Sequence, residues 1–360
     1  MEQITSWDIC FNLIIWLAVL FYYRGQIKRN TERNGTFGGF CIVIILFSTF
    51  GFCTGDFLHY ESLYADLRHS NYNIHIEPFY YWLIKVLPES YYIWRCAVWG
   101  TAAIILVLIF KRLRLNAGFA IFIFSLLLML YFPAPRQSLG YVVLLYGFVL
   151  IFFSDKSKAG SYILGAVLVF LSYFLHKSMV VYAIMLALAL IPFSKWIYMG
   201  SLFVFPIIYR SMYNLSSYVI ASAIADESTQ EVGERYLNSD FYQVANANGL
   251  VQLGIHRIPI LVLLILAIWK LYFKKEGIKY GYKVLLQYAY ILIYVSFLFN
   301  GQAVSAFLSP RFWDAALYPL TIFMIFFLYR QRRTPLIKGC FYMLILANLY
   351  DFAYMLYKIQ

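Results

Sequence analysis

Long hydrophobic runs separated by short connections extend along the whole chain, and clusters of Lys and Arg fall on alternate connections. These clusters are Arg24 to Arg33, Lys111 to Arg114, Lys156 and Lys158, Lys270 to Lys283, and Arg330 to Lys338. Hydrophobic residues make up 62% of the 360 residues and charged residues only 13%. A water-soluble protein of this length could not bury so much apolar surface, so part of it must face lipid. The sequence predicts an all-α protein that crosses a membrane many times.

The apolar runs predict about twelve transmembrane helices, since a helix needs roughly 20 residues to cross and the shorter runs can extend into neighbouring loops. The predicted spans are 9–23, 37–53, 93–110, 117–132, 138–153, 161–175, 179–193, 196–209, 258–273, 284–300, 312–329 and 339–356. Cytoplasmic connections carry the excess of Lys and Arg. This pattern predicts that the amino terminus and most acidic residues lie outside. The acidic amino end also lacks the basic region of a cleavable signal peptide, so we expect the first run to be retained.

The chain shows no internal repeat, and we predict a single integral membrane domain over 1–360. Its net charge is +12, but the cations form short blocks beside apolar runs rather than one basic stripe. Topology therefore explains the charge better than nucleic-acid binding does, and we expect no nucleic-acid partner.

Two predicted outer segments are long, 54–92 and 210–257, and we expect them to form the substrate face. The first contains 79–87 (FYYWLIKVL) between Pro78 and Pro88, which is too short to span and predicts a re-entrant or interfacial piece. The second opens with an amphipathic stretch, Met212–Ala225. It continues with Ser228-Thr-Gln-Glu231, which is typical of a capping box at the start of a short helix.

Unusual polar residues gather at the predicted outer ends of the spans. They are Asp56 with Tyr60 one turn later, Glu77 before Pro78, Arg136-Gln137 after Pro135, His176-Lys177-Ser178 between two spans, and Arg257 and Arg311 where later spans open. Each has an ordinary interpretation as an interfacial anchor, a hinge or a solubilising charge. However, an ionisable group at membrane depth costs about 2.5–3.5 kcal/mol on insertion scales. Several such groups on one side favour a functional site.

These residue types together suit one chemistry. Guanidinium groups bind the oxygens of a diphosphate in pairs, and a carboxylate or imidazole can take a proton from a sugar hydroxyl. The combination predicts glycosyl transfer from a lipid-diphosphate donor. The cations would stabilise the charge that develops on the leaving diphosphate, so we expect an enzyme that needs no metal and no cofactor.

The order of four short motifs also resembles a known family. Gly55-Asp56 with the tyrosines that follow, Glu77-Pro78, Arg136 at a helix mouth, and His176-Lys177-Ser178 between two spans are similar to the EpsG-type polysaccharide polymerases. That family is related to the O-antigen polymerase Wzy of bacterial surface-glycan assembly. The resemblance covers residues 40–195 by motif and the whole chain by its pattern of spans.

The resemblance implies a multi-pass inner-membrane glycosyltransferase with a GT-C-like architecture. Such an enzyme joins repeat units carried on undecaprenyl diphosphate at the periplasmic face, giving O-antigen of lipopolysaccharide or exopolysaccharide. Its expected partners are the lipid-linked repeat units, the bilayer, a chain-length regulator and a flippase. On this basis we expect catalytic roles for Arg136, His176, Glu77 and Asp56, and substrate binding by Arg311, Arg257, Lys177, Gln137, Tyr60 and Ser178. Asp56, Glu77 and His176 compete for the role of base.

Two other functions remain open at this point. A transporter or flippase of lipid-linked oligosaccharides would place charges within spans and often shows paired inverted repeats, whereas here the charges gather on one side. A membrane O-acyltransferase could also use an embedded histidine. Its acyl donor usually arrives from the cytoplasmic side, whereas His176 is predicted outside.

Overall fold

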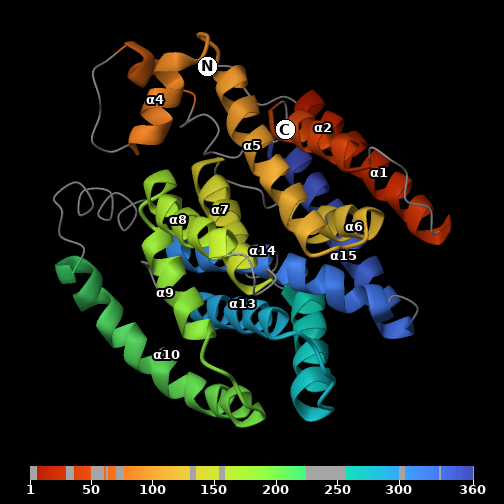
Figure 1. Ribbon diagram of the computed structural model, residues 1–360, viewed down its shortest axis with the longest axis vertical. Coiled ribbons are helices and arrows are strands. Elements are labelled where there is room, and N and C mark those ends of the chain that lie inside the picture. The colour runs from red at the N-terminus through yellow and green to blue at the C-terminus, as the bar shows by residue number, and fades with distance from the viewer. Residues whose placement is uncertain are drawn as a thin grey trace. The chain divides into compact units, whose positions relative to one another are not determined.

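The computed structural model describes residues 6–29, 36–49, 61, 64–69, 77–129, 135–153, 159–223, 257–299, 305–331 and 334–359. Every regular element within these ranges is a helix (Figure 1). The helices are α1 (Ser6–Arg29), α2 (Thr36–Thr49), α4 (Pro78–Val86), α5 (Tyr91–Arg112), α6 (Ala117–Leu127), α7 (Pro135–Phe152), α8 (Ala159–Leu175), α9 (Met179–Ala189), α10 (Lys195–Ala223), a helix over 257–268 that continues as the π-helix η2 (Trp269–Phe273), α13 (Tyr280–Leu298), α14 (Ser305–Gln331) and α15 (Pro335–Ile359).

The apolar runs of the sequence thus fold as helices, as predicted. Four stretches are long and apolar enough to cross a membrane: Tyr91–Arg112, Tyr280–Leu298, Arg311–Tyr329 and Pro335–Ala353. The other apolar helical stretches identified in the described residues have 10–17 residues, so the predicted number of twelve spans is not confirmed. The chain is a polytopic α-helical membrane protein.

Large apolar side chains are exposed on the outer faces of several helices. On α8, Ile163 is 66% exposed and Phe170 is 65% exposed, whereas Gly165 and Ser172 are buried. On α10, Leu202 and Phe203 are likewise exposed. Large apolar side chains exposed in rows are unfavourable in water and favourable against acyl chains. These faces therefore suit contact with the hydrocarbon of a bilayer.

The chain divides into two compact units. Unit 1 comprises Met1–Ile184, Thr321–Arg332 and Asn348–Gln360, and unit 2 comprises Met185–Leu320 and Arg333–Ala347. In unit 1, α1 packs against α2 and α6, α5 packs against α2 and α7, and α8 packs against α7 and α4.

Side chains tie the end of α6 into unit 1. The last carbonyls of a helix lack partners within the helix. Trp16 Nε1 of α1 donates to Ser125 O at 2.9 Å, and Asn348 Nδ2 of α15 donates to Leu126 O at 3.1 Å. Both side chains are completely buried. These bonds satisfy polar groups that would otherwise be costly inside an apolar core.

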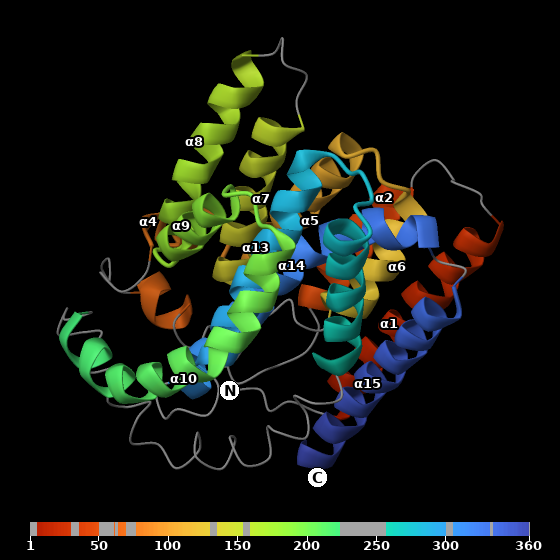
Figure 2. The ribbon, with the colours of Figure 1, turned by 90° about the horizontal axis from the view of Figure 1, so that it is seen from below.

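In unit 2, α10 packs against α13 through aromatic side chains. The ring of Tyr198 lies 4.8 Å from that of Tyr290 and 4.7 Å from that of Tyr272, and Tyr294 Oη donates to Ser201 O at 3.0 Å. The helix α10 carries Pro206 in its interior and bends along its length (Figure 2), as expected where proline removes a backbone hydrogen bond.

The predicted span 196–209 and the outer stretch that follows it form one helix. Residues 210–223 continue α10 without a break, so the start of the segment 210–257 is helical, as predicted. The remainder, including the capping box at Ser228, lies outside the described residues up to position 256.

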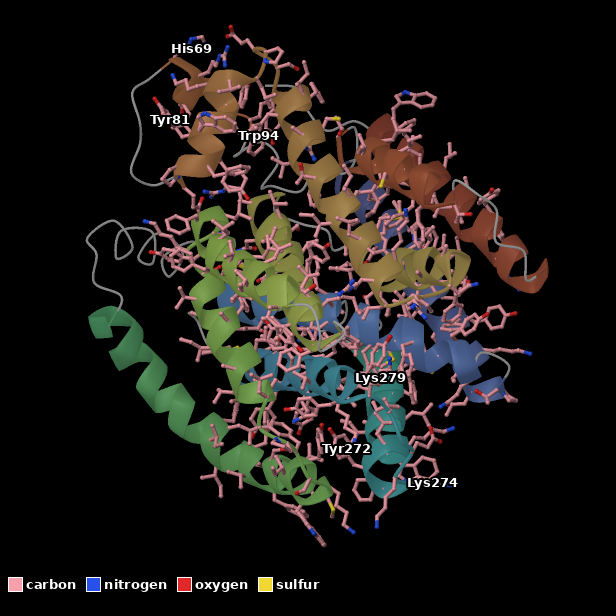
Figure 3. All side chains as sticks on the ribbon, viewed as in Figure 1. His69, Tyr81, Trp94, Tyr272, Lys274 and Lys279 are labelled. Atoms are coloured by element: carbon pink, nitrogen blue, oxygen red, sulfur yellow. The ribbon has the colours of Figure 1, made fainter. Side chains whose placement is uncertain are left out.

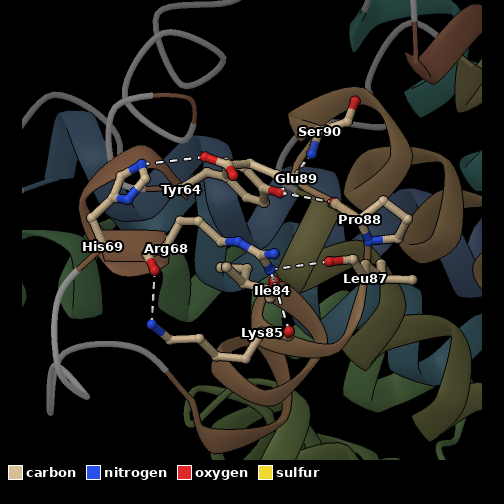
Figure 4. Close-up of polar contacts among 9 residues, drawn as sticks. All are labelled: Tyr64, Arg68, His69, Ile84, Lys85, Leu87, Pro88, Glu89 and Ser90. Atoms are coloured by element: carbon tan, nitrogen blue, oxygen red, sulfur yellow. Dashed lines mark hydrogen bonds and ion pairs between the residues drawn. The ribbon is translucent and has the colours of Figure 1, made fainter.

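The segment 79–87 forms the short helix α4, with Tyr80 and Ile84 buried. Its last carbonyls are held by Arg68 of the helical piece 64–69: Arg68 Nη1 donates to the carbonyl oxygens of Ile84, Lys85 and Leu87, at 3.0 Å for Leu87 (Figure 4). Tyr64 Oη accepts a bond from Ser90 N at 3.0 Å. A guanidinium at a helix carboxyl end also complements the helix dipole, so this piece fixes where α4 lies in unit 1.

Candidate functional site

The first turn of α4 brings a buried carboxylate to the site. Glu77 is the N-cap residue, in extended conformation, and Pro78 opens the helix, as proline does where no backbone N–H is needed. The Glu77 side chain makes no capping bond to its own helix. It is 7% exposed and pairs instead with Arg136, with Oε2 2.7 Å from Nη1.

Arg136 stands at the second position of α7, after Pro135. Besides the ion pair with Glu77, its carbonyl oxygen accepts a hydrogen bond from Tyr80 Oη at 2.9 Å. Tyr80 is completely buried, and the Arg136 side chain is 15% exposed. The first turn of α4 therefore holds the start of α7 through both the side chain and the backbone of one arginine.

The packing of α7 brings a second group of residues close to this pair. A Cβ on Gly140, one turn after Arg136, would lie 3.0 Å from Met179 Cγ at the start of α9. The ring of Tyr141 lies 4.7 Å from that of Tyr182. Because Met179 directly follows His176-Lys177-Ser178, this turn lies beside the first turns of α7. Gln137 and Ser138 on α7 are buried, whereas Lys177 is exposed.

His176 is held by the turn that it helps to form. Its Nδ1 accepts a bond from Ser178 N at 3.2 Å and lies 2.6 Å from Ser178 Oγ. A backbone N–H can only donate, so Nδ1 carries a lone pair and the ring proton is on Nε2. In this arrangement Nε2 of His176 is a hydrogen-bond donor. The geometry suits stabilisation of a negative oxygen better than removal of a proton.

Unit 1 thus gathers Glu77, Arg136, Gln137, His176, Lys177 and Ser178 around the ends of α4, α7 and α8. Three donors of different kinds (a guanidinium, an imidazole N–H and an ammonium) come from helix ends. One carboxylate orients the guanidinium. Arg136, which Glu77 holds in place, can bind an anion at little cost in reorganisation.

The other two predicted arginines belong to unit 2. Arg257 opens the helix 257–268 and is buried, with its guanidinium carbon 4.5 Å from the centroid of Trp313 and 5.6 Å from that of Phe297. Stacking on aromatic faces suits a guanidinium that is removed from water. Arg311 lies two residues before Trp313 on α14 and is partly buried.

Asp56 and Tyr60 lie outside the described residues. The sequence did not single out Tyr80, Arg68 or Arg95, of which Arg95 is a buried cation on α5, 5.6 Å from the ring of Tyr91. The signal for Tyr80 was its place one turn after Glu77, which puts both on the same face of a helix. Within the described ranges, no three His, Cys, Asp or Glu side chains gather closely enough to hold a metal ion.

Comparison with known proteins gives one match. The family model of the EpsG family matches residues 36–359. No curated protein and no solved structure matches the chain. The matched range contains all ten residues that we predicted for the site.

Proposed function

This chain belongs to the EpsG family, and on that premise we propose that it is a membrane polysaccharide polymerase. It transfers a growing glycan from undecaprenyl diphosphate to the terminal sugar of an incoming lipid-linked repeat unit, at the outer face of the bacterial plasma membrane. The observation that carries this proposal is the buried Glu77–Arg136 pair. A charged pair costs desolvation energy that its mutual attraction often only balances, so its presence at the ends of two membrane-protein helices favours a role in binding.

Arg136 is the residue that we assign to the diphosphate. A planar guanidinium offers five N–H donors and binds phosphate oxygens in pairs. Its bond to Glu77 and the bond from Tyr80 to its carbonyl fix both ends of the residue. Charge grows on the diphosphate as the glycosidic bond breaks, and a cation already in place stabilises that transition state.

His176 and Lys177 support the same step. The Nε2 proton of His176 and the ammonium of Lys177 lie on the turn beside the start of α7, where they can donate to further phosphate oxygens. Arg257 and Arg311, which belong to unit 2, remain proposed substrate-binding residues. The base that activates the acceptor hydroxyl is then a carboxylate, Glu77 or Asp56, because the ring nitrogen Nδ1 of His176 is occupied.

The test is polymerisation by the purified full-length protein supplied with lipid-diphosphate repeat units from the producing strain. We expect a ladder of polymer from the wild-type protein. Arg136→Ala should lower the rate by on the order of 10²–10³, the usual effect of losing one preorganised donor, and Arg136→Lys should retain part of it. Asp56→Asn identifies the base: a fall of about 10²–10⁴ assigns the role to Asp56, and an unchanged rate assigns it to Glu77. A normal ladder of polymer lengths from Arg136→Ala would show that the Glu77–Arg136 pair serves only to hold α4 and α7 together.

A further inference from the structure

The turn that joins η2 to α13 carries an unusual concentration of positive charge. Five lysines occur between 269 and 283, with Glu276 as the single acid in that stretch. Lys270 pairs with Glu276 at 3.6 Å. Lys274, Lys275 and Lys279 are exposed, and within the described part of the chain no carboxylate pairs with them. We call these three residues the lysine patch; Figure 3 labels two of them, Lys274 and Lys279.

Two of the three lysines occupy positions that are locally unfavourable for lysine. Lys275 follows the end of η2 in the left-handed region, with φ 55°, where glycine is the usual residue because it has no Cβ. Lys279 is the N-cap of α13 and makes no capping bond. Moreover, the positive end of a helix dipole disfavours a cation there. Backbone preference and helix capping therefore do not explain why lysine stands at either position.

A helix carboxyl end attracts cations, and this would account for Lys274 and Lys275. The effect falls off within the last turn of the helix, so it does not extend to Lys279. In unit 1, a basic residue likewise occupies a left-handed position that favours glycine: Arg114 has φ 53° after the end of α5. Both non-glycine residues with positive φ in the described ranges are thus basic residues at helix carboxyl ends.

Exposed aromatic residues flank the lysine patch along the chain. Trp269 and Tyr280 are each 44% exposed, and Phe273 is 42% exposed. Lys274 Nζ lies 4.5 Å from the centroid of the Trp269 ring. Tyr280 is also the first residue of a stretch that can cross a membrane. Aromatic rings mixed with lysines at the end of a span are typical of the headgroup level of a bilayer.

We propose that the lysine patch binds the phosphate groups of anionic phospholipid headgroups. The ammonium groups attract the negative lipid surface, while Trp269, Phe273 and Tyr280 lie between headgroups and acyl chains. The positive charge of the three lysines is thereby placed at the level of the lipid phosphate groups. This binding is independent of glycosyl transfer and of the groups around Arg136.

The test uses the full-length protein in neutral detergent at low salt, with a fluorescent phosphatidylglycerol as the probe. Unlabelled phosphatidylglycerol, phosphatidylcholine and sodium phosphate serve as competitors. We expect phosphatidylglycerol alone to compete well. The triple variant K274Q/K275Q/K279Q should bind on the order of 100-fold more weakly, since each lysine near a lipid surface contributes about fivefold. The triple variant K274R/K275R/K279R, which keeps the charges, should bind like the wild-type protein.

A single variant separates lipid binding from folding. Lys275→Gly removes one charge but also relieves the left-handed backbone. We expect it to bind the lipid about fivefold more weakly with a thermal midpoint that is unchanged or higher. Three results would overturn the proposal: undiminished binding by the glutamine triple variant, equal competition by phosphatidylcholine or free phosphate, and loss of binding in the arginine triple variant.

Discussion

Gly147 of α7 and Gly165 of α8 face each other so closely that a Cβ on either residue would lie 2.7 Å from the carbonyl oxygen of the other. A side chain can move aside, but a carbonyl oxygen within a helix cannot. Small residues allow membrane helices to approach in this way and to associate through backbone contact. The crossing aligns the two helices whose ends carry Arg136 and His176.

Alanine at either glycine should destabilise the protein. We expect Gly147→Ala and Gly165→Ala each to lower the free energy of unfolding by about 1–3 kcal/mol, because the added methyl forces the helices apart. Denaturant unfolding in detergent measures this. Gly160→Ala on the same helix is the matched control, since a Cβ there meets nothing within 4 Å. It should be neutral or stabilising by up to about 1 kcal/mol. Equal stability of Gly165→Ala and Gly160→Ala would contradict the close crossing.

The Glu77–Arg136 pair should show strong coupling. Glu77→Gln leaves a buried cation without its carboxylate, which costs about 3–5 kcal/mol. Removing both charges in E77Q/R136Q should cost less than the sum of the two single changes, as a double-mutant cycle of thermal unfolding would record. We expect this double variant to be folded and yet inactive in polymer formation. An active double variant would show that the pair serves folding alone.

The two roles of His176 can be separated by amide substitutions. Asn places an oxygen close to the position of Nδ1, so His176→Asn should keep the bond from Ser178 N and the stability of the α8–α9 turn. It removes the Nε2 donor, and we expect polymerisation to fall by on the order of 10²-fold. His176→Gln should destabilise the α8–α9 turn, because its longer side chain places the amide near the position of Nε2 and leaves Ser178 N without its acceptor. Full activity of the asparagine variant would limit His176 to the turn.

Arg68 should control how firmly α4 is held. Arg68→Met leaves the carbonyls of Ile84, Lys85 and Leu87 without their guanidinium partner. Hydrogen bonds to charged groups contribute about 1.5–3 kcal/mol, so amide exchange within Pro78–Val86 should rise by at least roughly tenfold. Lys85→Met is the control on the same helix, because it removes the bond from Lys85 Nζ to the carbonyl of Arg68 but leaves the guanidinium of Arg68 in place on the α4 carbonyls. Similar exchange in both variants would exclude the capping role.

The orientation in the membrane predicts the location of two reporters. A reporter fused after Lys158 should be cytoplasmic and one fused after Ser239 should be external, because Lys and Arg accumulate on cytoplasmic connections. Alkaline phosphatase activity measures external placement and fluorescence of a green fluorescent protein measures cytoplasmic placement. The opposite result for both would put the Arg136 end of the helices on the cytoplasmic face.

Several features could be predicted from local sequence. The apolar runs predicted the helices, and Glu77, Arg136 and His176 stood out because several ionisable residues on one side at membrane depth are costly without a function. The continuity of α10 could not be predicted in this way: hydropathy falls after residue 209, yet the apolar span and the amphipathic stretch that follows it form one helix, Lys195–Ala223. Hydropathy reports where lipid contact ends, whereas a helix ends only where its backbone bonds find no continuation.

The sequence by itself determined that this chain is a helical membrane protein, because apolar content and charge placement act residue by residue and can be summed along the chain. Its membership of the EpsG family is also a property of the sequence, carried by the family-model match over residues 36–359. Only the tertiary structure decided that Glu77 pairs with Arg136, 59 positions away, and that Nδ1 of His176 faces its own turn. It also decided that Arg257 is stacked on Trp313 in the other unit. Such choices depend on which helix ends meet, and that is set by packing contacts such as those at Gly147 and Gly165.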